Sequence, residues 1–376
     1  MTSYLFRPLQ IGSLHLRNRV VVSPMCQYSA SEGSATAWHR THWGTLVHSG
    51  AALVMVEATA VAAEGRITYA DLGLYSDANE HAMAHVLQDL RRHSDTPLGI
   101  QLGHAGRKAS SEVPWRGGRL LDAGNARGWQ RLAPSAAPLT ASEPAPLALD
   151  ARDMKRIREA FAASARRAAR LDFSTVQLHF AHGYLMHQFL SPIANGRTDA
   201  YGGTLENRMR YPLEVLDAVR QAWPDKPLGI RVSATDWIDG GWDLQQTLAL
   251  AEGAKALGCD WIDVSSGGIS PAQKIAAGPG YQVPFARAVR QSTGLLTGAV
   301  GLITGAQQAE DIIANGSADL VSLARAMLWN PHWPWQAAAE LGADVVAPPQ
   351  YWRSAPRGVR GVFRNHQDGA RGSAVK

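Results

Sequence analysis

The stretch LGIRVSATDWIDGGWDLQQTLALAEGAKALGCDWIDVSS, residues 228–266, contains the unit that decides the fold. Its two ends, 228–233 and 261–266, are short and largely apolar, which is typical of strands buried on both faces of a parallel sheet. The segment between them, 243–257, carries apolar side chains at helical spacing, and Asp243 is its predicted N-cap. A strand, a helix and a second strand in this order predict two parallel strands joined by a crossover helix.

The same alternation recurs along the whole chain. Eight runs have strand character, at 20–23, 52–57, 98–102, 175–179, 228–233, 261–266, 295–300 and 319–324. Helical periodicity lies between most of them, at 77–93, 150–171, 205–222, 243–257, 281–292 and 304–315. The predicted N-caps are Asp150, Thr204, Asp243 and Thr304, and the predicted stops are Gly258 and Gly316. Eightfold alternation predicts an α/β fold of the (β/α)8 TIM barrel type.

A doubly wound sheet is the alternative fold, but it normally opens with a glycine fingerprint after its first strand, and the sequence shows none there. We expect one barrel domain over residues 1–342. It carries a long insertion, rich in Gly, Pro, Ala and Ser, at 103–148, and loops of that length are usually functional lids or disordered spacers. A C-terminal segment, 343–376, follows, and its last ~10 residues are expected to be disordered.

Composition excludes several classes of protein. Hydrophobic residues make up 45% and charged residues 18% of the 376 residues, which is a globular balance. No apolar run approaches ~18 residues and none follows a basic start, so neither a membrane span nor a secretory signal is expected. The formal charge is +5, but the basic residues are spread out, which disfavours nucleic acid as a partner. Two cysteines, Cys26 and Cys259, are too few for an iron–sulfur cluster and indicate a reducing compartment, the cytoplasm.

Polar or glycine-rich residues follow nearly every predicted strand. The active site of a TIM barrel forms where the carboxyl ends of its strands meet. The residues at these ends are Pro24 to Tyr28, Glu57 to Ala60, Gln101, His179, Arg231, Ser265 to Gly268, Gly298 to Gly301, and Arg325. Any one of them alone is more often structural, whereas their common position indicates a site.

His179 and His182 come just past a predicted strand, where both can point into one pocket. A metal pair is one interpretation, and it requires a third ligand such as His104 or Cys26. Two neutral donors that hold a carbonyl or nitro oxygen are the other interpretation. Tyr184 follows closely, and a phenol with a pKa of ~10 can protonate a carbanion formed nearby. This set suits polarisation and protonation better than hydrolysis.

The loops after the last two strands predict a phosphate site. The glycines of TGAVG at 297–301 allow close backbone approach, and Arg325 offers a guanidinium suited to two-point phosphate binding. Together they predict a ligand with a terminal phosphate, and simple tight turns are the structural alternative.

Several longer motifs resemble the old yellow enzyme family. They are SPMCQYSA at 23–30, EATAV at 57–61, GRIT at 65–68, GIQLGHAGRKA at 99–109, HFAHGYLMHQFLSP at 179–192, NGRTDAYGGTLENRMR at 195–210 and TGAVGLI at 297–303. The resemblance runs from about Leu5 to Arg353. SPMCQYS resembles the thermophilic-like subclass, and PWRGGRLLDAGNARGW at 114–129 with YWR at 351–353 resembles its xenobiotic reductase branch.

The resemblance implies a TIM barrel that holds FMN non-covalently. The residues that it assigns to FMN are Pro24, Met25, Cys26, Ala60, Gln101, His179, Arg231, Gly301, Ala324 and Arg325. In this assignment Gln101 and Arg231 bond the pyrimidine edge of the flavin, and Ala60 contributes backbone. Ala324 stands where the family usually has glycine, but its backbone N–H remains for the phosphate.

The resemblance also implies the substrate side of the site. His179 and His182 would bond the substrate's activating oxygen, and Tyr184 would deliver a proton to the α-carbon. Tyr28 would contact the activating group, and Cys26 would tune the flavin and contact the substrate without attacking it. Phe180 replaces a small residue within the motif and is expected to pack into the barrel.

By the same resemblance the chain is an NADPH dehydrogenase and ene-reductase. NADPH, or NADH, would reduce FMN and leave, and an enone, enal or nitroalkene would then accept the hydride in the same place, in ping-pong turnover. Trp352 and Arg353 match a C-terminal segment that enters the neighbouring subunit's site, so a homodimer is expected.

Three other functions stay open at this point. A metal-dependent or Schiff-base barrel lyase is the first, although no lysine lies at a strand end within an apolar run. A 2,4-dienoyl-CoA reductase would carry a cysteine cluster and an extra dinucleotide domain. A flavin-binding protein without turnover would not need the intact histidine pair and tyrosine.

Overall fold

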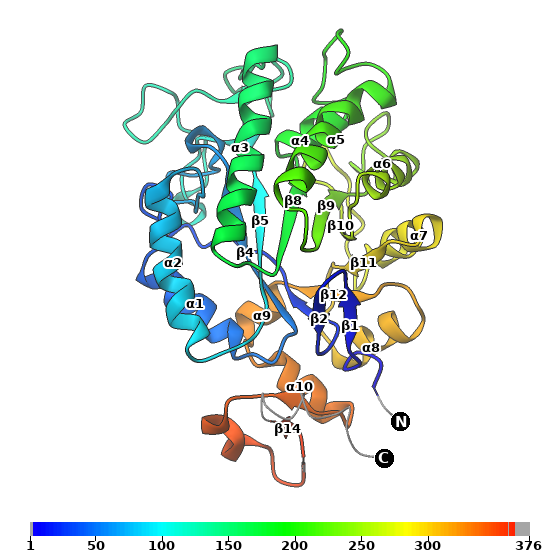
Figure 1. Ribbon diagram of the computed structural model, residues 1–376. Helices are drawn as coiled ribbons and strands as arrows, with labels where there is room; N and C mark the ends of the chain where they lie inside the picture. Colours follow the sequence, from blue (N-terminus) through cyan, green and yellow to red (C-terminus); the bar gives the residue numbers. More distant parts are fainter. Residues whose placement is uncertain (1–2, 360, 365–376) are drawn as a thin grey trace.

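Eight parallel strands form a closed barrel in the computed structural model, which describes residues 3–359 and 361–364 (Figure 1). In barrel order they are β3 (Val20–Val22), β4 (Leu53–Ala60), β5 (Leu98–Gly103), β8 (Thr175–Phe180), β9 (Leu228–Ser233), β10 (Trp261–Ser265), β11 (Leu296–Ala299) and β12 (Leu320–Leu323). Each coincides with one of the eight runs of strand character, so the predicted TIM barrel is confirmed.

Helices surround the barrel (Figure 1). They are α1 (Ala37–Val47), α2 (Asp77–Arg91), α3 (Ala151–Arg170), α5 (Leu205–Ala222), α6 (Leu244–Ala256), α7 (Val283–Thr293) and α8 (Ala306–Ala314). The short helices α4 (Leu185–Leu190) and α9 (Arg325–Trp329) follow β8 and β12, and α10 (Trp333–Glu340) comes next. All six predicted helical segments are present, and α1 was not predicted.

Helix α6 shows how local sequence sets these boundaries. The Asp243 carboxylate accepts a hydrogen bond from Gln246 N at 2.9 Å, which satisfies one of the free N–H groups of the first turn. At the other end Gly258 has φ +81°, and Cys259 N donates to Ala254 O at 3.0 Å, so the chain leaves the helix in a left-handed turn.

The predicted caps at Asp150 and Thr204 are also observed, but the one at Thr304 is wrong. Helix α8 begins after Gly305, which has no side chain to accept a bond. Thr304 takes part through its backbone only: its N–H donates to the side chain of Gln308, a residue inside the helix, at 3.1 Å.

A hydrophobic cluster closes the amino-terminal end of the barrel. The hairpin of β1 (Leu9–Ile11) and β2 (Leu14–Leu16) packs its apolar side chains against residues from the strands, including the fully buried Trp261. The cluster leaves the other end of the barrel, where the carboxyl ends of the strands lie, for a site to form.

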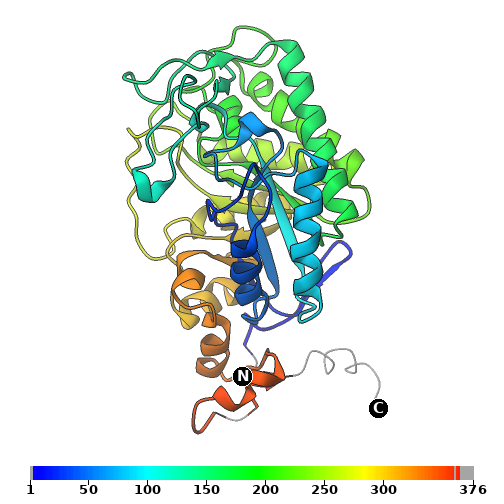
Figure 2. The ribbon, with the colours of Figure 1, turned by 90° about the vertical axis from the view of Figure 1, so that its left-hand side faces the viewer.

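The insertion 103–148 covers that carboxyl end (Figures 1 and 2). It contains η2 (Gly106–Lys108), η3 (Pro114–Arg116), β6 (Leu132–Ala133) and β7 (Leu147–Ala148). The buried Arg107 ties it to the loop after β10 by donating to Ile269 O at 2.7 Å, and the buried Arg131 braces the insertion internally by donating to Arg107 O at 3.0 Å.

The C-terminal segment lies at the opposite end of the molecule, beyond α10 (Figure 1). It comprises β13 (Val345–Val346), η4 (Pro349–Ser354) and β14 (Phe363–Arg364). The domain division at residue 342 stays a prediction, and the disorder expected for the last ~10 residues falls outside the described residues. Among the described residues, no helix is both long enough and apolar enough to cross a membrane.

Candidate active site

His179 is the last polar residue of β8 and is buried at the carboxyl end of the barrel. Its Nδ1 accepts a hydrogen bond from Ala181 N at 3.3 Å, so in the neutral ring the proton lies on Nε2. Burial, and next the positive charge of Arg231, lower the pKa of His179 well below its usual value. His179 is therefore an uncharged ring with one N–H left to donate.

His182 lies in a tight turn after β8 and has φ +58°, in the left-handed region. Ser233 holds this turn because its Oγ accepts from His182 N at 2.9 Å and donates to Gly267 O at 2.8 Å. The His182 Nε2 lies 2.8 Å from Ser265 Oγ. Burial, followed by Arg231, also lowers the pKa of His182 well below its usual value.

The two imidazoles meet edge to face, with ring centroids 5.1 Å apart and planes at 90°. Tyr184 completes the group, since its ring centroid lies 4.8 Å from that of His179. Burial raises the pKa of Tyr184 well above its usual value, so the phenol keeps its proton at neutral pH. The structure thus brings together the three residues predicted to be catalytic.

Lys108 also joins this group. The sequence analysis included it only within the motif GIQLGHAGRKA and predicted no role for it. Its Nζ donates to His182 O at 2.8 Å and to Gly268 O at 3.2 Å, and it lies 5.0 Å from the centroid of the Tyr184 ring. Burial, with Arg107 as a further cause, lowers the pKa of Lys108 to about 8. The ammonium therefore ties two loops together beside the phenol.

A third histidine, His187 on α4, supports the turn that carries His182, and the sequence analysis predicted no role for it. Its Nδ1 accepts from Gly183 N at 2.9 Å, and its Nε2 lies 2.8 Å from the carboxylate of Asp236, with both side chains fully buried. Asp236 in turn accepts from Ser191 Oγ at 2.6 Å. A single sequence cannot reveal this pair, because Asp236 comes from the loop after another strand, β9.

Cys26 and Tyr28 lie in the loop after β3. Burial, with Asp71 and Glu57 nearby, raises the pKa of the Cys26 thiol well above its usual value, which does not suit a nucleophilic thiolate. The Tyr28 ring packs edge-on against Trp115 of the insertion, with centroids 5.8 Å apart. The insertion therefore supplies one wall beside a predicted substrate contact.

A small cavity of about 20 Å³ opens beside His179 and Tyr184. It has room for about one water molecule, and its walls include Asp71, His104, His179 and Tyr184. His104 Nδ1 accepts from Gly106 N at 3.1 Å, and its buried Nε2 has no partner among the described residues.

Gln101 and Arg231 lie inside the barrel on β5 and β9, and both are buried. Gln101 Nε2 donates to Gln177 Oε1 at 2.7 Å, and Arg231 Nε lies 3.1 Å from Asp263 Oδ2. These contacts leave the Gln101 carbonyl and the other donors of the Arg231 guanidinium for a ligand. Gln101 and Arg231 lie on the two strands that flank β8, and an amide and a guanidinium are the kinds of group that can bond the pyrimidine edge of a flavin.

The predicted phosphate residues follow two neighbouring strands, β11 and β12. Gly301, in the turn after β11, has φ +118°, and a Cβ there would lie 2.8 Å from Gln282 Nε2. Ala324 directly follows β12, and the exposed Arg325 begins α9. A glycine in the turn after β11 and an exposed guanidinium after the neighbouring strand β12 are groups that can bind a phosphate.

The remaining predicted residues are distributed differently. Pro24 and Met25 lie in the loop after β3, and Ala60 ends β4. The Ala60 N–H donates to Leu72 O at 2.9 Å and its carbonyl accepts from Leu74 N at 2.9 Å, so both backbone groups of Ala60 already have partners and do not bear out the backbone contact expected of it. Trp352 and Arg353 lie on η4, at the far end of the barrel, and the chain's own site does not include them (Figure 1).

Comparisons with known proteins agree with this arrangement. A family model described as the NADH:flavin oxidoreductase / NADH oxidase family matches residues 4–344. An NADPH dehydrogenase of Geobacillus thermodenitrificans (strain NG80-2) is 44% identical over 355 residues, which are 94% of this chain and 99% of that protein. An NADPH dehydrogenase of Bacillus subtilis (strain 168) is 40% identical, with the same coverage of both chains.

The chain belongs to this family, that of the old yellow enzymes. It is an oxidoreductase, and its cofactors are FMN and a nicotinamide coenzyme. Morphinone reductase is similar in structure, with a TM-score of 0.74 and 27% identity, over 92% of this chain and 91% of that one. A 2-naphthoyl-CoA reductase complex has a TM-score of 0.80 at 21% identity, over 90% of this chain and 52% of that one, and this likeness concerns the fold alone.

The metal-dependent alternative lacks a ligand set. Over residues 3–359 and 361–364, no three His, Cys, Asp or Glu side chains are grouped so that they could hold a metal ion.

The neutral histidines make stability depend on pH. Below pH ~6.5 the unfolded chain takes up protons on histidine, whereas folded His179 and His182 do not, because their pKa values are lowered. The free energy of unfolding should therefore fall as the pH drops below that value. Replacing both by asparagine should make this fall shallower by up to about 2.7 kcal/mol per pH unit.

Urea unfolding of the FMN-loaded enzyme from about pH 7 to about pH 5 measures this slope. His15→Asn is the matched control, because His15 is exposed on β2. An equal slope in the wild-type enzyme and the double variant would contradict the neutral state of the two histidines.

Proposed function

We propose that this enzyme reduces activated C=C bonds, those of α,β-unsaturated carbonyl compounds and of nitroalkenes. The observation that carries the proposal is the buried, uncharged group of His179, His182 and Tyr184. Two imidazole donors suit an oxygen on which negative charge develops, and a protonated phenol suits the carbon next to it. Membership of a hydride-transferring family supports the same reaction type.

Each histidine presents one nitrogen to the substrate in this proposal. His179 Nε2 carries the proton, because its Nδ1 accepts from Ala181 N. His182 Nε2 lies 2.8 Å from Ser265 Oγ, and the proposal assigns the single hydroxyl proton to this contact and not to the longer one of 3.4 Å with Gln282 Oε1, so the proton of the ring lies on Nδ1. Both N–H groups would then donate to the same activating oxygen, which withdraws electrons from the double bond.

Tyr184 protonates the α-carbon and Lys108 assists. The cation near the face of the phenol ring lowers the cost of the negative charge that develops as the proton leaves. The contacts of the same Nζ to two backbone carbonyls hold this cation in place. Tyr28, with Trp115 against it, forms the outer wall of the substrate pocket.

The proposal assigns FMN to residues at the carboxyl ends of the neighbouring strands. Gln101 and Arg231 would hold the pyrimidine edge, Gly301 and Arg325 the phosphate, and the loop at Pro24 to Cys26 would pack on the ring. FMN held by these residues would supply the redox chemistry, which is hydride transfer from NADPH or NADH to the β-carbon of the alkene, with the two substrates reacting in turn. The protein supplies position, donors and the proton. A cytoplasmic location stays a prediction, and two free cysteines suit it.

The purified protein should be yellow and should lose its colour when NADPH is added without oxygen. Addition of 2-cyclohexenone should then restore the oxidised flavin spectrum and yield cyclohexanone. Visible spectroscopy and product analysis test both steps. A colourless protein, or a reduced flavin that the enone does not reoxidise, would overturn the proposal.

Replacement of Tyr184 by phenylalanine should slow alkene reduction by about 10²-fold or more, since a positioned proton donor contributes that much. Flavin reduction by NADPH should change little, because that half-reaction needs no proton from the phenol. Stopped-flow measurements of each half-reaction give the two rates. Equal slowing of both would show that Tyr184 shapes the pocket and is not the proton donor.

We also propose a homodimer in which Trp352 and Arg353 complete the partner's site. Both side chains are exposed, and η4 lies away from the insertion that covers the chain's own site (Figure 1). Trp352 Nε1 donates to Ala347 O at 3.0 Å, which holds the segment in a defined shape. Arg353→Ala should raise the KM for the enone about tenfold, the effect of losing a hydrogen bond from a charged group.

Arg357→Ala is the matched control, because Arg357 is exposed on the same segment. Steady-state kinetics give the KM, and sedimentation equilibrium gives the mass of the assembly. A monomer, or equal KM values for the two variants, would contradict a shared site.

A further inference from the structure

Helix α2 carries two exposed histidines, one turn apart, on the outer surface of the barrel (Figure 1). His81 and His85 are four residues apart, so their side chains share one face of the helix. Their Nε2 atoms lie 3.0 Å apart, and the rings meet at 90° with centroids 4.5 Å apart. Two imidazole nitrogens this close together on one helix face can both reach a single transition metal ion.

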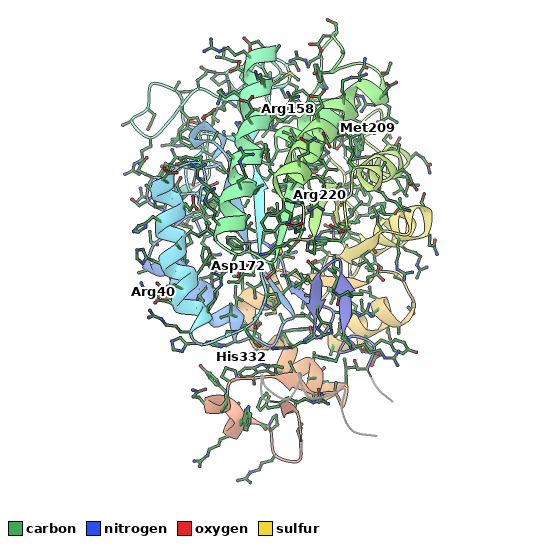
Figure 3. The ribbon with its side chains drawn as sticks, viewed as in Figure 1. Arg40, Arg158, Asp172, Met209, Arg220 and His332 are labelled. Atoms are coloured by element: carbon green, nitrogen blue, oxygen red, sulfur yellow. The ribbon has the colours of Figure 1, made fainter. Side chains whose placement is uncertain are left out.

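The charged neighbours on this face are already paired with arginines. Asp77, one turn before His81, accepts from Arg167 at 2.8 Å. Asp89, one turn after His85, lies 3.0 Å from Arg40, which Figure 3 shows at the outer edge of the molecule. The two histidines are therefore the ligands that the helix itself offers, and water would complete the shell of a bound ion.

We infer that His81 and His85 form a surface site for a divalent transition metal ion, and that Ni²⁺ and Cu²⁺ fit it best. With metal–nitrogen bonds of about 2.0–2.1 Å, a 3.0 Å separation corresponds to an N–metal–N angle of about 94°. Adjacent positions of an octahedral or square-planar ion have this angle. A tetrahedral zinc ion would need the nitrogens about 3.3 Å apart, so it fits less well.

The bound ion would link two successive turns of α2 and hence stabilise the folded helix. Binding to the folded chain alone raises the unfolding temperature by mass action. The site is independent of the proposed ene-reduction, because α2 contributes no residue to the group around His179 and Tyr184.

The test uses the untagged, FMN-loaded enzyme, stripped with a chelator and titrated with NiCl₂ or CuSO₄. Calorimetry should show one ion per chain, and the Cu²⁺ form should show two nitrogen ligands by electron paramagnetic resonance. His81→Ala or His85→Ala should each weaken binding by about 100-fold, because a chelating pair becomes a single ligand. Nickel should raise the unfolding temperature of the wild-type enzyme but not of either variant.

His15→Ala is the matched control, because it removes another exposed histidine, one that lies on strand β2 and not on a helix with a second histidine four residues away. It should leave the affinity unchanged, and all variants should keep the wild-type flavin spectrum. Equal binding by the wild-type enzyme and the His81→Ala variant would overturn the proposal. So would an absence of binding, which would leave the two rings as a simple hydrogen-bonded pair.

Discussion

The site depends on the close approach of two backbone turns, one after β8 and one after β10. A Cβ at Gly183 would lie 2.1 Å from Gly268 O, and one at Gly268 would lie 2.5 Å from His182 Cα. Both glycines have positive φ, a conformation that other residues adopt only at a cost. Lys108 joins the two turns through their carbonyls. Because the turns touch, His182 takes the left-handed conformation that places its ring against that of His179.

Burial then sets the chemistry of the groups that these turns hold. Burial lowers the pKa values of His179 and His182, so their imidazoles stay uncharged. It raises the pKa of Tyr184, so the phenol keeps its proton. The thiol of Cys26 is held neutral for the same reason. The result is a group of uncharged donors beside the Lys108 ammonium, and this arrangement suits the oxyanion of the proposed reaction.

The floor of the site is polar although it lies inside a barrel. Gln101 with Gln177, and Arg231 with Asp263, come from four adjacent strands and satisfy one another in part. Such pairs cost less than isolated buried groups, and their spare donors and acceptors suit a heterocycle. The departures from the family pattern lie outside this floor. Phe180 is fully buried, as expected, and Ala324 keeps its place directly before Arg325.

The sequence by itself determined the barrel, because parallel strands buried on both faces leave continuous apolar runs that are readable without coordinates. It also identified His179, His182 and Tyr184, which lie within six residues of one another and share one strand end. Local caps such as Asp243 were equally readable, since a cap acts within one turn. The family motifs then identified the flavin.

Only the tertiary structure revealed the contacts between residues distant in sequence. Lys108 reaches Gly268, and His187 reaches Asp236, from loops that follow different strands. The tautomer of His179, the lowered pKa values and the remoteness of Trp352 from the chain's own site likewise follow from position in space. The physical reason is that burial and long-range hydrogen bonding are properties of the packed chain, whereas strands, helices and caps arise from neighbours along it.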